Sequence, residues 1–177
     1  MTLRLLLLFA CVSSAAHAGE SCRLPPCDDF STQTFFARAI AVIDGDTVLV
    51  LRNGKPVKVR LADIDAPEKG QDFGMVSRRS LSEMVLGKQL RVSTRAVDKY
   101  GRIVAQLSLN EFDVNEEQVR RGMAWQYSYR FSNPRFIALQ DDAQKAGRGL
   151  WVQAHPVKPW QWRKQHPLDV SPGQASK

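Results

Sequence analysis

The sequence is poor in cysteine and histidine, and it has no internal repeat. Of its 177 residues, three are Cys and three are His. Neither His155 nor His166 has zinc-finger spacing to the two cysteines that follow residue 18, which argues against a structural zinc site. The apolar stretch Leu5–Val12 is short beside the about 20 apolar residues of a membrane-spanning helix. The sequence therefore favours neither a zinc finger nor a membrane-spanning helix.

The N-terminal residues instead have the pattern of a secretory signal. Arg4 precedes the apolar stretch Leu5–Val12, and Ala-His-Ala at 16–18 forms a small-x-small cleavage site. We expect residues 1–18 to be removed and the protein to be exported to the periplasm or the extracellular space, without stable membrane insertion after cleavage. A membrane anchor and a lipoprotein modified at Cys11 are the alternatives.

The chain also has fewer acidic than basic residues. Its 25 Lys and Arg against 18 Asp and Glu give a net charge of +7. Removal of residues 1–18 takes away one Arg and no carboxylate, so 24 basic and 18 acidic side chains remain, a net charge of +6. A basic protein favours polyanionic partners through the release of counterions. Charge alone leaves nucleic acid, anionic lipid and cell-wall polymer equally open.

The length after the signal is that of one ordinary domain, and apolar residues make up 44% of the sequence. Residues 19–34 carry prolines and small polar side chains and predict an N-terminal arm without regular structure. Within the arm, export makes a disulfide between Cys22 and Cys27 plausible, with free thiols or a partial metal clip as alternatives. The domain is expected over 35–165 and a flexible tail over 166–177.

Apolar periodicity predicts five strands and three helices. The expected strands are Phe36–Ile43, Thr47–Arg52, Val57–Ile64, Gln89–Val97 and Ile103–Leu109. The expected helices are Gly74–Leu86, Asn115–Arg121 and Asn133–Ala146. Short strands with one intervening helix and two later helices suit a small closed barrel. The sequence therefore predicts a mainly β fold with helices, a five-stranded OB-type Greek-key barrel with three packed α-helices.

Charged side chains gather in three separate segments, at residues 44–47, 60–68 and 98–102. Taken singly, each segment is ordinary turn or loop chemistry. Together they supply arginines that can grip phosphate oxygens and carboxylates that can hold a hard cation. These are the groups that phosphodiester cleavage requires. Strict strand alternation places Asp65 on the opposite face from Arg60, so a common site requires a bulge or twist near Asp63.

The three segments read Ile-Asp-Gly-Asp-Thr, Arg-Leu-x-x-Ile-Asp-Ala-Pro-Glu and Asp-Lys-Tyr-Gly-Arg. In this order they resemble the staphylococcal nuclease (thermonuclease) family. The resemblance covers roughly Phe36–Trp151, and the Pro-Trp-x-Trp-Arg segment at Pro159–Arg163 is similar to bacterial members of the family.

The resemblance implies a Ca2+-dependent endonuclease that hydrolyses DNA and RNA by in-line attack of water and leaves 3′-phosphates. Glu68 would orient or deprotonate the water, and two arginines would clamp the phosphate. The implied catalytic residues are Arg60, Glu68 and Arg102. The implied Ca2+ ligands are Asp46, Asp65 and the carbonyl of Ala66, and Asp44 would support these ligands or their waters.

Substrate contacts are expected from Lys99, Tyr100, Tyr127 and Tyr129, whose rings would suit single-stranded or frayed nucleic acid. Packing against the last helix is the alternative for Tyr127 and Tyr129. A monomer is expected. Two other functions remain open: a non-catalytic nucleic-acid-binding OB-fold module, and an envelope protein that binds anionic polymers.

Overall fold

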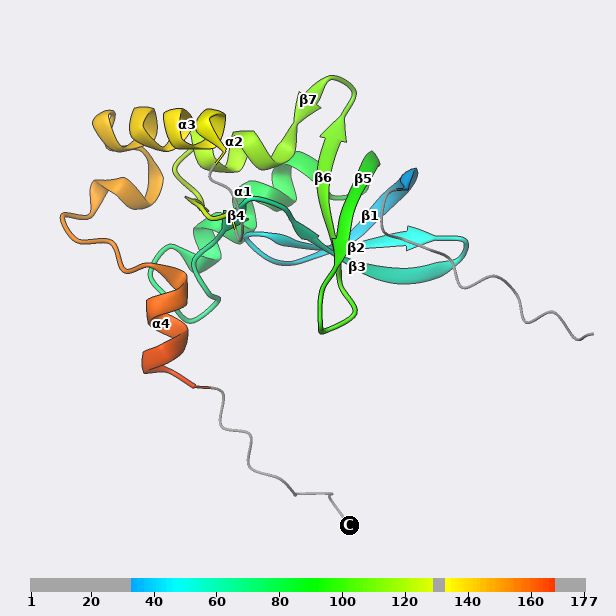
Figure 1. The fold of residues 1–177 in the computed structure, drawn as a ribbon, viewed down its shortest axis with the longest axis horizontal. Coiled ribbons are helices and arrows are strands. Elements are labelled where there is room, and N and C mark those ends of the chain that lie inside the picture. Colours follow the sequence, from blue (N-terminus) through cyan, green and yellow to red (C-terminus); the bar gives the residue numbers. More distant parts are fainter. Residues whose placement is uncertain (1–32, 129–132, 168–177) are drawn as a thin grey trace, which may run out of the picture.

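The structure is a computed structural model that describes residues 33–128 and 133–167 (Figure 1). Several predictions concern residues outside this part of the chain: the signal peptide, the pairing of Cys22 with Cys27, residues 19–32 of the arm, Tyr129, and residues 168–177 of the tail. Among the described helices, none has the length and apolar character needed to span a membrane.

Five strands close into a barrel, as the sequence predicts. They are β1 (Thr34–Asp44), β2 (Thr47–Arg52), β3 (Lys55–Leu61), β5 (Gln89–Val97) and β6 (Ile103–Leu109). Neighbours in the order β3-β2-β1-β5-β6 are antiparallel, and the parallel pairing of β3 with β6 closes the barrel. The closing register runs from Val59 opposite Ile103 to Leu61 opposite Ala105. This mixed closed barrel confirms the predicted OB-type architecture.

Three two-residue strands were not predicted, because they are too short to show an alternating pattern. They are β4 (Ile64–Asp65), β7 (Phe112–Asp113) and β8 (Trp125–Gln126). β7 extends the main sheet beside β6, and β4 pairs with β8 as a separate two-stranded sheet. The predicted strand over Val57–Ile64 is thus divided between β3 and β4.

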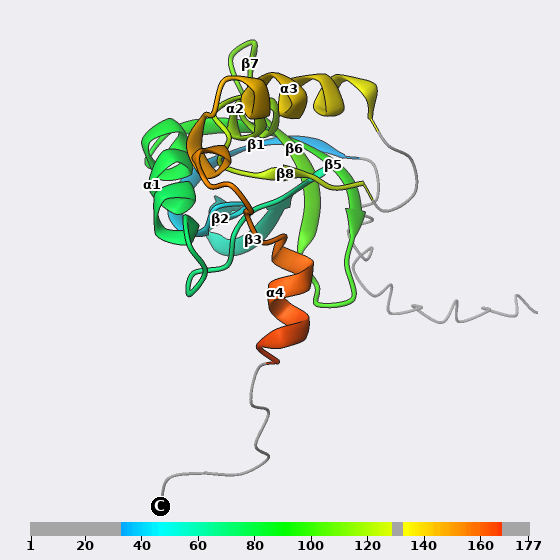
Figure 2. The same cartoon turned by 90° about the vertical axis from the view of Figure 1, so that its left-hand side faces the viewer.

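The described residues form four α-helices where the sequence predicted three. They are α1 (Gly74–Val85), α2 (Val114–Arg120), α3 (Pro134–Lys145) and α4 (Pro159–Gln165), with a 3-10 turn η1 (Gly149–Val152) before α4. The helix α4 was not predicted, because its apolar residues Trp160 and Trp162 are two positions apart, which is not a helical spacing. Pro159 occupies its first turn, where a proline ring costs no backbone hydrogen bond. In both ribbon views α4 lies away from α2 and α3 (Figures 1 and 2).

The core lies inside the barrel and under α1 and α2. Alternate residues of the strands point inward, and burial of each such Leu, Ile or Val stabilises the fold by about 1.5–3 kcal/mol. The buried strand residues include Ala37, Ala39, Val48, Val50, Val59, Leu61, Leu90, Val92, Ala105 and Leu107. Leu81 and Val85 of α1 and Val119 of α2 join the same cluster.

Candidate active site

Helix α2 fixes the two turns that carry the central charged residues. Gln118 is fully buried, and its side-chain amide donates to the carbonyl of Gly45 at 2.8 Å, in the turn between β1 and β2. Asn115 donates to the carbonyl of Ala62 at 3.0 Å, in the turn between β3 and β4. A Cβ on Gly45 would lie 1.9 Å from the hydroxyl oxygen of Ser77, so only glycine fits this close approach.

The β3–β4 turn brings Asp65 to the same side as Arg60. β3 ends at Leu61, and Asp63 has φ 63°, a left-handed conformation that interrupts the strand. The chain then re-enters an extended conformation at Ile64, displaced from the alternation of β3. The predicted irregularity near Asp63 is therefore present. Because it interrupts the alternation of the strand, Arg60 and Asp65 can lie on the same face.

Arg60 bridges two buried carboxylates. Its Nη1 lies 2.5 Å from Asp46 Oδ1, and its Nη2 lies 2.8 Å from Asp65 Oδ1. Asp46 is 3% exposed and Asp65 is 0% exposed. Burial tends to lower the pKa of Arg60, but the charges of Asp46 and Asp65 outweigh it and raise the pKa above its ordinary value. Arg60 is therefore permanently charged and neutralises part of the buried acidic charge.

Asp44 stands next to this pair without joining it. Its Oδ1 accepts a hydrogen bond from the backbone N–H of Asp46 at 3.1 Å. Burial, followed by the negative charge of Asp46, raises the pKa of Asp44 to about 7. The predicted supporting residue thus contacts the backbone of a predicted metal ligand.

The oxygen groups at this point suit a hard divalent cation. Asp46 and Asp65 bind the two terminal nitrogens of the same guanidinium, so both carboxylates face one point of the site. The backbone N–H of Ala66 donates to Asp46 Oδ2 at 2.9 Å, which places the Ala66 peptide beside them. In the described part of the chain, no three His, Cys, Asp or Glu side chains are grouped closely enough to hold a metal ion by themselves. A cation here would need the carbonyl of Ala66 and water to complete its coordination.

A residue that the sequence did not predict for the site, Arg163 of α4, completes the charged cluster. Its Nη2 lies 2.8 Å from Asp65 Oδ2, and its Nη1 lies 3.2 Å from Asp65 Oδ1 and 2.6 Å from Glu68 Oε1. Burial opposes the charged form, but the hydrogen bonds to Asp65 and Glu68 prevail and raise the pKa of Arg163. The one sequence signal was its place in the Pro-Trp-x-Trp-Arg segment.

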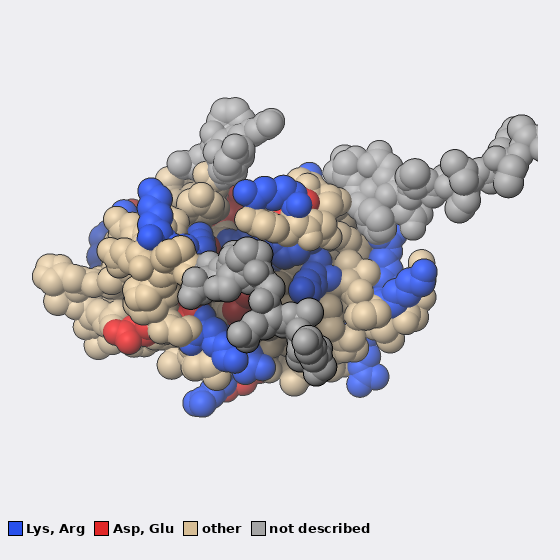
Figure 3. All heavy atoms as spheres, turned by 90° about the horizontal axis from the view of Figure 1, so that it is seen from below, with Lys and Arg blue, Asp and Glu red and all other residues tan. Residues whose placement is uncertain are grey.

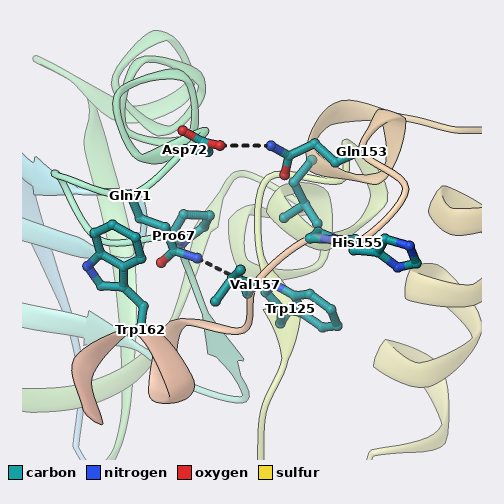
Figure 4. Close-up of a pocket in the computed structure, with 10 residues that line it drawn as sticks. Pro67, Gln71, Asp72, Trp125, Gln153, His155, Val157 and Trp162 are labelled. Atoms are coloured by element: carbon teal, nitrogen blue, oxygen red, sulfur yellow. Dashed lines mark hydrogen bonds between the residues drawn. The ribbon is translucent and has the colours of Figure 1, made fainter. Parts of the chain in front are cut away.

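Glu68 forms no hydrogen bond or ion pair with Asp46 or Arg60 in the described part of the chain, and its loop is bonded to the C-terminal segment. Gln71 accepts from the backbone N–H of Glu68 at 3.2 Å and donates to the carbonyl of Val157 at 2.5 Å. Gln153 donates to Asp72 Oδ2 at 3.1 Å, close to this bridge (Figure 4). The loop that bears Glu68 and the chain that leads into α4 therefore hold each other in place.

Arg102 faces the same groove as Arg60 without touching the carboxylate cluster. The groove has a volume of about 1050 Å3 and is lined by Arg60, Arg95, Lys99, Arg102, Tyr127 and Asn133, among others. Arg102 Nε donates to Asp98 Oδ2 at 2.7 Å. Burial tends to raise the pKa of Asp98. Hydrogen bonds from the backbone and side chain of Arg102 and from the backbone of Tyr100 outweigh burial and lower this pKa. Asp98 thus holds Arg102 at the edge of the groove.

The predicted substrate residues occupy different settings. Tyr100 is 72% exposed, with Lys99 Nζ 5.1 Å and Arg102 Cζ 5.4 Å from its ring centroid. Tyr127 lines the groove and also packs against Trp160 of α4, with ring centroids 5.1 Å apart. Tyr127 therefore packs against α4, a helix that was not predicted, and not against the last predicted helix, Asn133–Ala146. Its contact with a substrate stays a prediction. Lys and Arg outnumber Asp and Glu on the face shown in Figure 3.

Comparisons with known proteins agree on one family. A sequence model described as "Staphylococcal nuclease homologue" matches residues 58–153. An "Uncharacterized endonuclease" of Haemophilus influenzae is 36% identical over 168 residues, covering 94% of this chain and 86% of the relative. An Escherichia coli protein of the same description is 42% identical over 127 residues, covering 71% of this chain and 83% of the relative.

A third relative, "Micrococcal nuclease" of Shigella flexneri, is 34% identical over 143 residues, covering 73% of this chain and 81% of the relative. The family match and these names support a nuclease. The closed barrel and the charged cluster agree with them. The chain belongs to the staphylococcal nuclease homologue family.

Proposed function

We propose that the protein is a Ca2+-dependent endonuclease that hydrolyses phosphodiesters of DNA and RNA. The observation that carries this proposal is the position of Arg60. It bridges two buried carboxylates and also lines a groove that Lys99 and Arg102 share. A site that joins buried acidic oxygens to several cations suits a phosphate together with a divalent cation.

In this proposal Asp46, Asp65 and the carbonyl of Ala66 hold Ca2+, and Asp44 orients the Asp46 segment. The bound cation supplies positive charge to the phosphate and makes a bound water more acidic. Asp44 acts through its hydrogen bond to the backbone of Asp46.

Glu68 orients the attacking water and accepts its proton. The side chain of Glu68 is 38% exposed, so water reaches it. The water oxygen forms a bond to phosphorus while the bond from phosphorus to the 5′ oxygen breaks, which leaves a 3′-phosphate. Arg60 and Arg102 stabilise the charge that grows on the phosphoryl oxygens in the transition state.

Recognition of the substrate rests on the backbone phosphates and on exposed rings. Lys99 and Tyr100 lie at the β5–β6 turn, and Tyr127 lines the groove. Together with Tyr129 they suit single-stranded or frayed strands, whose bases are free to stack. Phosphate contacts carry no sequence information, so cleavage is expected to depend little on base sequence.

We also propose that the enzyme acts as an exported monomer, in the periplasm or outside the cell. The support is the signal pattern of residues 1–18. Mass determination of the exported protein should give a chain that starts at Gly19, and an intact leader would contradict cleavage at this point.

The test of the activity is a digest of denatured DNA and of RNA with Ca2+, with a chelator as control. We expect cleavage with Ca2+, little cleavage without it, and 3′-phosphates on the products. Binding without cleavage under every divalent cation would instead favour a non-catalytic OB-fold module. Equal retention of other anionic polymers, again without cleavage, would favour an envelope protein.

A further inference from the structure

Arg163 reaches the charged cluster from outside the part of the chain that the family model matches. That match ends at residue 153, whereas α4 begins at Pro159. The guanidinium nevertheless donates hydrogen bonds to both oxygens of Asp65, at 2.8 and 3.2 Å, and to one oxygen of Glu68, at 2.6 Å. A C-terminal helix therefore places a charged group directly between a predicted cation ligand and the predicted base.

The helix that carries Arg163 is anchored by packing and by hydrogen bonds. Trp160 packs edge-on against Trp125 with centroids 6.0 Å apart, and it also contacts Tyr127. Pro159 is buried. Ahead of the helix, Gln71 binds the carbonyl of Val157. Because the helix is fixed at its start, Arg163 reaches the acidic pair from a defined position.

The contact with Glu68 restrains a carboxylate that solvent would otherwise leave free. Among the described residues, Arg163 alone contacts the Glu68 carboxylate through an ion pair. A half-exposed side chain without a partner samples several rotamers, and a proton acceptor must lie in hydrogen-bond reach of its water. Loss of Arg163 would therefore disorder Glu68 without removing it.

The contact with Asp65 has the opposite consequence for a cation. Oδ1 of Asp65 already accepts from Arg60 and Arg163, and Oδ2 accepts from Arg163. A divalent ion at Asp65 must share these oxygens and is repelled by the nearby positive charge. Loss of Arg163 would therefore favour cation binding.

We propose that Arg163 is a positioning residue of the active site, which orients Glu68 for catalysis and at the same time lowers the affinity of Asp65 for the cation. This inference rests on the proposed function, since it assigns Glu68 and Asp65 the roles given there. If α4 only supported the fold, loss of Arg163 would weaken Ca2+ binding and catalysis together.

The first test is calorimetric titration of Ca2+ into the full protein and into Arg163→Gln, without nucleic acid. The variant is expected to bind Ca2+ at least about tenfold more tightly, because it removes a positive charge that repels a divalent ion at a buried carboxylate. Lys164→Gln is the matched control, because Lys164 is the exposed neighbour on α4 and the substitution removes the same charge. It should leave the affinity within about twofold of the wild type.

The second test is turnover of a single-stranded oligonucleotide at saturating Ca2+. Arg163→Gln is expected to lower kcat about tenfold with a smaller change in KM, within the range of general-base effects. Arg163→Lys keeps the charge but loses the guanidinium fork, so it should return the Ca2+ affinity to near the wild-type value and restore kcat only in part.

Tighter Ca2+ binding together with a lower kcat supports the inference. Weaker Ca2+ binding with a lower melting temperature, or no change in either property, overturns it. If the wild-type protein binds Ca2+ but cleaves nothing, the proposed function fails, and the Ca2+ titration of Arg163→Gln still decides whether Arg163 opposes the cation.

Discussion

Two buried carboxylates govern the electrostatics of individual residues in this site. Asp46 and Asp65 are almost completely removed from solvent, and Arg60 lies between them. A buried charge is costly unless an opposite charge and hydrogen bonds compensate it. Arg60 therefore has a structural effect in addition to its proposed role at the phosphate.

Substitution of Arg60 by Gln should reduce stability in a way that depends on the cation. Without divalent ions, the variant leaves buried Asp46 without a positive partner among the described residues and leaves Asp65 with Arg163 alone. The free energy of unfolding should therefore fall by about 3 kcal/mol. Saturating Ca2+ should recover part of this loss, because the ion compensates the same charges. Urea unfolding with Ca2+ and with chelator measures both values, and exposed Arg91→Gln is the control. An equal loss in both conditions would contradict a shared cation and arginine site.

Substitution of Glu68 by Gln should affect catalysis and not folding. Its carboxylate is half exposed and pairs with a half-exposed arginine, and such pairs contribute about 0–1 kcal/mol. The expected fall in kcat is about 10²- to 10⁴-fold, the usual contribution of a general base. Glu83→Gln on α1 makes the same chemical change beside Arg79 and Arg121 and should retain full activity. Near-normal turnover of Glu68→Gln would remove Glu68 from the proposed mechanism.

Asp98 provides a pH-dependent contribution to stability. Its folded-state pKa lies below the ordinary 3.8, because its hydrogen bonds with Arg102 and Tyr100 outweigh the effect of burial. A lowered carboxyl pKa stabilises the fold above the unfolded-state pKa, and this contribution is lost as the pH falls through the folded-state pKa. Asp98→Asn should therefore destabilise the protein near pH 7, with a difference from wild type that shrinks below about pH 4. Urea unfolding across this pH range measures it, and a pH-independent difference would contradict the assignment.

At the scale of secondary structure, α2 couples the barrel to the site. Its buried amide Gln118 binds the carbonyl of Gly45 and accepts from Ser80 at 2.9 Å. Gln118→Ala should lower the free energy of unfolding by about 2–4 kcal/mol, because these buried groups lose their partner. Exposed Gln144→Ala on α3 is the matched control and should change stability by less than about 0.5 kcal/mol. If the two variants lost equal stability, α2 would not be the anchor of the β1–β2 turn.

The strands and longer helices could be predicted because their apolar periods extend over several residues. β2, β5 and β6 have the predicted bounds, and α1 ends one residue before its predicted end. The short elements β4, β8 and α4 carry no such period. Their formation depends on partners distant in the chain, such as Asp65 opposite Trp125.

The site could be predicted as far as its motifs extend. Arg60, Asp46 and Asp65 meet as expected, because the irregularity at Asp63 corrects the strand parity. Arg163 was missed because its partner Glu68 lies 95 residues away in sequence, and the Pro-Trp-x-Trp-Arg segment that contains it does not indicate what the arginine contacts. Contacts of this kind arise from tertiary packing, here of Trp160 on Trp125.

At the scale of the whole molecule, one part of the fold holds the acidic turns in place and another part supplies the cationic side chains. The closed barrel and α2 fix the acidic turns, while the β5–β6 turn and the C-terminal helix bring further cations to them. The resulting groove presents Arg60, Lys99 and Arg102 on a protein whose net charge is positive. Such a surface attracts polyanions over long range, and the local cluster then selects the phosphate for reaction.

Cleavage of phosphodiesters with a divalent cation is the activity that we propose for this site. The most direct measurement is a digest of a defined single-stranded oligonucleotide by the exported protein, with Ca2+ or with chelator, followed by mass analysis of the product ends. We expect internal cleavage with Ca2+, 3′-phosphate ends, and loss of both on chelation. Intact oligonucleotide under Ca2+, or cleavage that continues undiminished in chelator, would contradict it.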